Sequence, residues 1–142
     1  NPYYILPRVL QQRLQKLMDE YVAGVSTYYM TNANLLAQGL HLLTMLKEDS
    51  KNMRAKDLHE LMRAWENYHR IVTAEAHLRH IQFREETRYP GFYYRADFLE
   101  LNEAEWKCFV NSKIDPETKV WTCFKRPHVD VVEKFYHGQA KH

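Results

Sequence analysis

The stretch ETRYPGFYYRAD, residues 86–97, ends a long helical pattern at the pair Pro90-Gly91. Proline lacks a backbone donor, and glycine permits backbone conformations that other residues avoid, so this pair is a strong helix break. Two arginines, Arg88 and Arg95, flank the break together with several aromatic rings. The sequence therefore predicts an irregular corner, with a helical part before it and a different structure behind it.

Three amphipathic helices are predicted upstream of the corner, within residues 7–87. The first begins at Pro7, which fits the first turn of a helix because the N–H that it lacks would have no partner there. A threonine or asparagine at positions 31–34 can cap the second helix, and the third begins near Asp57. Short connections favour antiparallel neighbours, so we expect a three-helix antiparallel bundle of the spectrin-repeat type.

The third helix carries apolar residues on two stripes. The stripe that is expected to face the other two helices comprises Leu58, Leu61, Met62, Trp65, Tyr68, Val72, Ala76, His80 and Phe83. A second stripe, in the distal half, comprises Ile71, Ala74, Leu78 and Ile81. Because a soluble domain rarely leaves a contiguous apolar stripe in water, Ile71 and Leu78 are predicted to dock, with the aromatic corner, on another domain or subunit.

Behind the corner the hydrophobic period changes from that of a helix to that of a strand. Apolar and polar residues alternate from Trp106 and again from Val120, with turn residues at 115–118 between the two segments. These patterns predict a mainly α fold in which the bundle is followed by a corner and a β-hairpin within about residues 88–126, and then by a tail, 127–142. Cys108 and Cys123 could be cross-strand neighbours, and we expect free thiols because such pairing strains disulfide geometry.

The composition fits one domain, residues 1–142. A net charge of +2, with both signs interspersed, argues against a nucleic-acid partner. No apolar run approaches the roughly 18 residues of a membrane span, so no membrane insertion is expected. Two cysteines suit a reducing cytoplasm. The first residue is Asn1, which suggests a piece of a longer polypeptide.

The motifs that carry chemistry are weak in this chain. Glu66 with His69, and His77 with His80, have helical spacing that suits metal ligands, but no further ligands complete either set. No glycine-rich phosphate loop and no nucleophile motif is present. We therefore expect no catalytic, cofactor-binding or metal-binding residue in this segment.

The two arginines of the corner admit two interpretations. Arg88 and Arg95, with Asp97 and the rings around them, can anchor a carboxylate or a partner's backbone. Alternatively, an internal Arg–Asp pair fixes the corner where the chain leaves the third helix. The internal pair is the favoured interpretation.

The corner, together with the segments WKCFVNSK (106–113) and DLHELMRAWE (57–66), resembles the C-terminal part of the alpha subunits of dissimilatory adenylylsulfate reductases. These subunits belong with the fumarate reductase and succinate dehydrogenase flavoproteins, which carry the pattern Glu-Ser-Arg-Gly-Ala-His-x-Arg-x-Asp followed by Asn-Trp. The insertion Tyr89-Pro90, and a tyrosine in place of the histidine, are typical of the sulfur-metabolising branch. The matching positions here are Glu86, Thr87, Arg88, Gly91, Phe92, Tyr93, Arg95, Asp97 and Trp106.

The resemblance implies that the parent enzyme interconverts adenosine 5'-phosphosulfate with sulfite and AMP through a flavin adduct. FAD would be held by an upstream Rossmann-type domain, and electrons would pass through a beta subunit with two [4Fe-4S] clusters. This chain would then be the C-terminal helical domain, which supports the flavin-binding domain and subunit assembly, and its motif positions carry no implied catalytic role. The alternative is a free-standing helical interaction module without redox activity.

Overall fold

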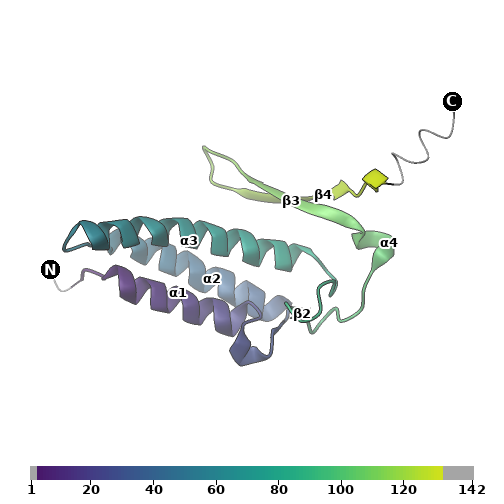
Figure 1. Cartoon of the computed structure of the whole chain (residues 1–142), viewed down its shortest axis with the longest axis horizontal. Helices are drawn as coiled ribbons and strands as arrows, with labels where there is room; N and C mark the ends of the chain where they lie inside the picture. The colour runs from purple at the N-terminus through teal and green to yellow at the C-terminus, as the bar shows by residue number, and fades with distance from the viewer. Residues whose placement is uncertain (1–2, 133–142) are drawn as a thin grey trace.

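A computed structural model describes residues 3–132. Helices α1 (Pro7–Tyr21), α2 (Ala33–Asp49) and α3 (Leu58–Phe83) lie along the long axis of the molecule and pack against one another (Figure 1). Helices α1 and α3 run in one direction, and α2 runs in the opposite direction. The predicted mainly α fold with a three-helix antiparallel bundle is therefore confirmed. The short elements between and after them are η1 (Val25–Thr27), β1 (Met30–Thr31), η2 (Ser50–Asn52), β2 (Tyr94–Arg95), α4 (Glu103–Trp106), β3 (Cys108–Ile114) and β4 (Trp121–Pro127).

The three long helices begin where the capping signals predict. Pro7 occupies the first turn of α1. The side chain of Asn32 accepts a hydrogen bond from the Leu35 N–H at the start of α2, and Asp57 does the same for the Glu60 N–H at the start of α3. Each cap satisfies a backbone donor that a helix start leaves without a partner.

The core lies between the three long helices, and α3 faces it with the stripe that was predicted to be external. Ile71 is 2% exposed and Leu78 is fully buried, so the prediction that these two residues dock on another domain was wrong. Their line continues through the small residues Ala64 and Ala74 and the buried amide of Asn67. Small side chains let the helices approach closely, whereas the sequence interpretation assigned the largest apolar side chains to the interior.

The other stripe of α3 faces away from the bundle in its N-terminal half. Trp65 is 60% exposed and Leu58 is 84% exposed, although both were predicted to face the other helices. We call this surface the outer stripe of α3, and it comprises Leu58, Leu61, Met62, Trp65 and Val72.

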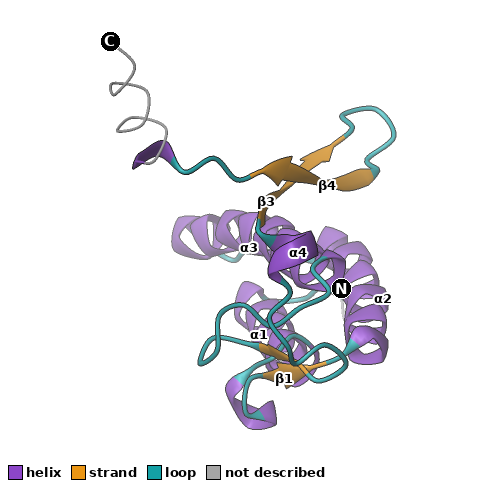
Figure 2. Ribbon diagram, turned by 90° about the vertical axis from the view of Figure 1, so that its right-hand side faces the viewer, coloured by secondary structure: helices purple, strands orange, loops and turns teal. Residues whose placement is uncertain are grey.

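Strands β3 and β4 form the predicted antiparallel hairpin, which lies on α3 on the side away from α1 (Figures 1 and 2). Trp106 is the last residue of α4 rather than the first residue of the hairpin. In the register of the two strands Cys123 lies opposite Ser112, and Cys108 lies opposite Pro127. The cysteines are therefore not cross-strand neighbours, and both are free thiols.

A second, very small sheet joins distant segments of the chain. Strand β1 pairs in parallel with β2, so that Met30 lies opposite Tyr94 and Thr31 lies opposite Arg95. The sequence interpretation did not predict this pairing. Of the predicted tail, residues 133–142 lie outside the part that the structure describes. Among residues 3–132, no helix combines the length and the apolar character needed to cross a bilayer.

Candidate functional site

The segment between α3 and the hairpin is built on ion pairs, and we call Arg84, Glu86, Arg88, Arg95 and Asp97 the arginine corner. Glu86 is fully buried and accepts hydrogen bonds from Arg84 Nη1 and Arg88 Nε, each at 2.6 Å, and from the Asn102 N–H at 2.9 Å. Burial acts to raise the pKa of Glu86, but these hydrogen bonds and the charge of Arg88 outweigh it, so the pKa lies below its usual value. Glu86 is thus a buried carboxylate at neutral pH.

Arg95 closes the C-terminal end of α3. Its buried guanidinium donates to the carbonyls of Ile81 at 2.7 Å and Arg84 at 3.0 Å, which an ending helix leaves without backbone partners. The same guanidinium forms a bidentate pair with Asp97, at 2.9 and 2.8 Å. The favoured interpretation, an internal Arg–Asp pair, is what the structure contains.

Asp97 extends this pair to a second helix. Its carboxylate also accepts a hydrogen bond from the Ala33 N–H, at the first position of α2. The hydrogen bond from Arg95 chiefly lowers the pKa of Asp97, and the Ala33 N–H lowers it further. Through Asp97 the end of α3 and the start of α2 are held together.

Arg88 lies nearer the surface than Arg95, but both ends of its guanidinium are engaged. It pairs with Glu86, and its Nη1 donates to Glu103 of α4 at 2.8 Å. Arg84 also donates to the carbonyls of Trp106 and Cys108, each at 2.8 Å. These bonds fasten α4 and the start of β3 to the corner.

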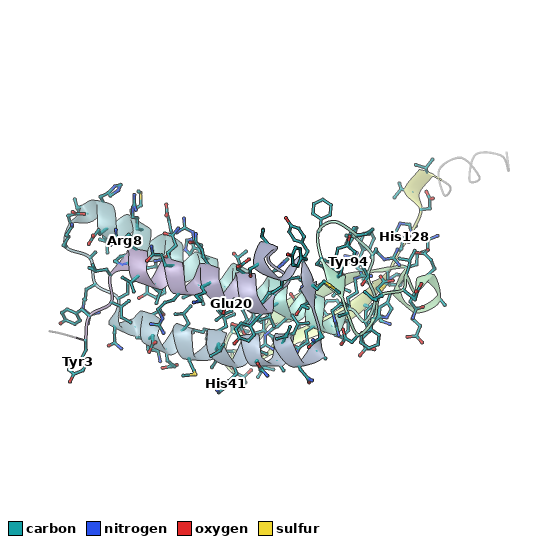
Figure 3. The ribbon with its side chains drawn as sticks, turned by 90° about the horizontal axis from the view of Figure 1, so that it is seen from below. Tyr3, Arg8, Glu20, His41, Tyr94 and His128 are labelled. Carbon is teal, nitrogen blue, oxygen red and sulfur yellow. The ribbon has the colours of Figure 1, made fainter. Side chains whose placement is uncertain are left out.

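The Pro-Gly break forms the outer edge of the corner. Gly91 has a φ of 91°, and its N–H donates to the hydroxyl of Tyr94 at 2.9 Å. Tyr93 packs against the cluster of buried residues that includes Leu78, and burial raises the pKa of its hydroxyl. Figure 3 shows Tyr94 and His128 at one end of the molecule and Tyr3 at the other.

Trp106 fixes the hairpin to α3. The buried indole meets the ring of Phe83 edge to face, with 5.6 Å between centroids, and the ammonium of Lys125 lies 3.7 Å from its ring centre. These contacts join α4, β4 and α3 at one point.

An open groove of about 630 Å³ lies between the end of α3, the corner and β3. Of the residues that the structure describes, Arg84, Arg88 and Lys107 line it with positive charge, and no carboxylate lines it. His77 and His80 lie on one wall, and His80 Nε2 is 2.8 Å from the Ser112 hydroxyl. Burial lowers the pKa of both histidines. The neighbouring His80 lowers the pKa of His77 further, and Arg84 lowers the pKa of His80 further.

The metal-ligand candidates of the sequence do not converge. Within residues 3–132 no group of three or more potential ligands comes together. Glu66 forms an i,i+4 ion pair with Arg70 at 3.1 Å.

The sequence interpretation named Arg88, Arg95 and Asp97 but gave no role to Arg84 or to the carboxylate of Glu86. Arg84, Glu86 and Arg88 occupy every second position after α3, and an extended backbone would place such residues on one side of the chain. Such an alternation of opposite charges directly after a helix was the available signal.

The chain matches known proteins over nearly all of its length. Residues 11–133 match the family model described as "Fumarate reductase flavoprotein C-term". The adenylylsulfate reductase subunit alpha of Megalodesulfovibrio gigas is 56% identical over 132 residues, which are 93% of this chain and 20% of that protein.

Two solved structures superpose closely on this chain. One is adenosine-5-phosphosulfate reductase in complex with sulfite as a covalent adduct, and the other is adenylylsulfate reductase from the hyperthermophilic Archaeoglobus fulgidus. Each match has a TM-score of 0.91 and 59% identity, and covers 94% of this chain and 21% of the other. The chain thus spans about a fifth of the length of the proteins that it matches.

Proposed function

This chain belongs to the family of fumarate reductase flavoprotein C-terminal domains, and we propose that it is the C-terminal helical domain of an adenylylsulfate reductase alpha subunit. The observation that carries the proposal is the 56% identity to such a subunit over 93% of the chain. The arginine corner lies within residues 11–133, which match the family model.

The proposed parent subunit binds FAD in the part that lies outside this chain and interconverts adenylylsulfate with AMP and sulfite. The sulfite adduct of one structural relative supports this substrate class. Electrons then pass to or from a beta subunit that carries [4Fe-4S] clusters, in the cytoplasm. We assign no cofactor, metal or catalytic residue to residues 1–142.

The proposed role of this domain is mechanical support for the flavin-binding domain and for subunit assembly. The arginine corner supports such a role, because its side chains join α2, α3, α4 and β3 through hydrogen bonds that lie within the domain. Gly91, Tyr93 and Trp106 contribute to the corner's turn and to its packing.

The test is to express the complete reading frame that contains residues 1–142 together with any adjacent iron–sulfur subunit. We expect a yellow protein with about one flavin per polypeptide, and AMP-dependent oxidation of sulfite with an artificial electron acceptor. A purified protein without flavin, or a rate of sulfite oxidation that does not depend on AMP, would contradict the proposal. The free-standing interaction module would then be the better description.

A further inference from the structure

The outer stripe of α3 is a continuous apolar surface on one side of a helix. Leu58, Trp65 and Val72 are spaced seven residues apart, so their side chains lie on one line along the helix, and Leu61 and Met62 flank that line. All five are exposed. Charged neighbours such as Arg63 and Glu66 border the surface, as a polar rim borders the apolar centre of an interface.

The hairpin covers the continuation of this line. Arg79, seven residues beyond Val72, lies under the ring of Trp121 at 5.8 Å, and Phe83 packs on Trp106. Figure 1 shows the hairpin over the C-terminal half of α3 and no ribbon over the N-terminal half. Among residues 3–132, one face of α3 is therefore covered at its C-terminal end and exposed at its N-terminal end.

The chain enters the bundle beside the bare end of α3. The Ile5 N–H donates to Asn52 at 3.0 Å, and the Arg54 N–H donates back to Ile5 at 3.0 Å. Asp57 and Leu58 follow a few residues later. Tyr4 is exposed at this entrance, with the guanidinium of Arg54 4.5 Å from its ring centre.

We propose that the outer stripe of α3 docks on the part of the same polypeptide that precedes residue 1, which is the flavin-binding part of the parent subunit. This inference rests on the proposed function. The matched proteins are about five times longer than this chain, and the family is a C-terminal one, so most of their length precedes it. A segment tethered at Tyr3 has a millimolar effective concentration at a surface beside its tether, which an untethered partner lacks.

The test uses the complete flavin-loaded subunit and a matched pair of variants. Met62→Glu places a charge in the outer stripe, and Met45→Glu places the same charge on the exposed side of α2; the two methionines are 53% and 54% exposed. We expect Met62→Glu, alone or with Trp65→Glu, to make cleavage by a protease of broad specificity, such as proteinase K, at the junction before Tyr3 about tenfold faster. Met45→Glu should leave the rate unchanged.

Hydrogen exchange in α1 and α2 verifies that each variant keeps the bundle folded, and Leu58→Ser gives a milder second change in the stripe. Junction cleavage at the wild-type rate in all stripe variants would overturn the proposal. The proposal would also be overturned if the stripe variants lost a copurifying iron–sulfur subunit, or a homodimer, while the junction stayed protected from cleavage. Failure of the proposed function appears separately, as absent flavin in the wild-type subunit.

Discussion

At the scale of single residues, Arg95 acts as the C-terminal cap of α3. A helix leaves its last carbonyls without backbone partners, and glycine-based turns usually satisfy them. At the end of α3 the buried guanidinium of Arg95, fourteen positions beyond Ile81, donates hydrogen bonds to these carbonyls instead. The Arg–Asp pair itself was predictable from the sequence, but its carbonyl partners were not, because they depend on the path of residues 84–95.

Glu86→Gln should destabilise the 142-residue chain by about 3 kcal/mol at pH 7, because it leaves Arg84 and Arg88 without their buried counter-charge. Urea denaturation measures the difference. Glu103→Gln removes an exposed partner of the same Arg88 and should cost less than about 1 kcal/mol. Equal losses in the two variants would contradict the assignment of Glu86 as the centre of the corner.

The acid dependence of the Glu86→Gln effect follows from its lowered pKa. The carboxylate contributes stability above the pKa it has when unfolded, about 4.3, and loses it as the pH falls through the lower pKa of the folded state. The difference in the free energy of unfolding between wild type and variant should therefore decrease as the pH falls from 5 toward 3. A gap that widens in acid would refute this.

Gly91→Ala should cost only about 1 kcal/mol, because the strain comes from the backbone alone. The φ of 91° disfavours an L side chain, but within residues 3–132 no atom outside Gly91 and its two chain neighbours lies within 4 Å of the position that a Cβ would take. Thermal unfolding of the variant measures the loss. A much larger loss would mean that the residues around Gly91 pack more closely than the structure shows.

At the scale of elements, the sequence predicted where the helices begin but misjudged how α3 is turned. Pro7, Asn32 and Asp57 act through neighbours a few residues away, so local reasoning finds them. The orientation of α3 depends on which side chains fit between two other helices. Small Ala64 and Ala74 fit there, and Trp65 does not, which residue-by-residue hydrophobicity cannot reveal.

Leu78→Ala should destabilise the chain by about 3 kcal/mol, since it opens a cavity in a fully buried site. Val72→Ala, on the outer stripe, should change the free energy of unfolding by less than about 0.5 kcal/mol in the isolated chain. Denaturant titration of both variants decides between the two faces of α3. If Val72→Ala were the more damaging change, the original assignment of the faces would be restored.

At the scale of the whole molecule, the groove between α3 and the hairpin makes stability depend on pH. His77 and His80 have lowered pKa values in the folded state, so the unfolded chain takes up protons first as the pH falls below about 6.5. The melting temperature should therefore drop between pH 7 and pH 5. In the double variant His77→Gln, His80→Gln, the part of the fall in melting temperature that these histidines cause should disappear. If the melting temperature of the variant depended on pH as in the wild type, other groups would cause the fall.

The parallel pairing of Met30 with Tyr94 has a consequence for the order in which the molecule folds. Both α2 and α3 lie between these residues, so closing this loop early in the reaction carries a large entropic cost that only a preformed bundle offsets. We expect the corner to be unstructured in the folding transition state. Stopped-flow kinetics should then show that Glu86→Gln accelerates unfolding and leaves the refolding rate nearly unchanged.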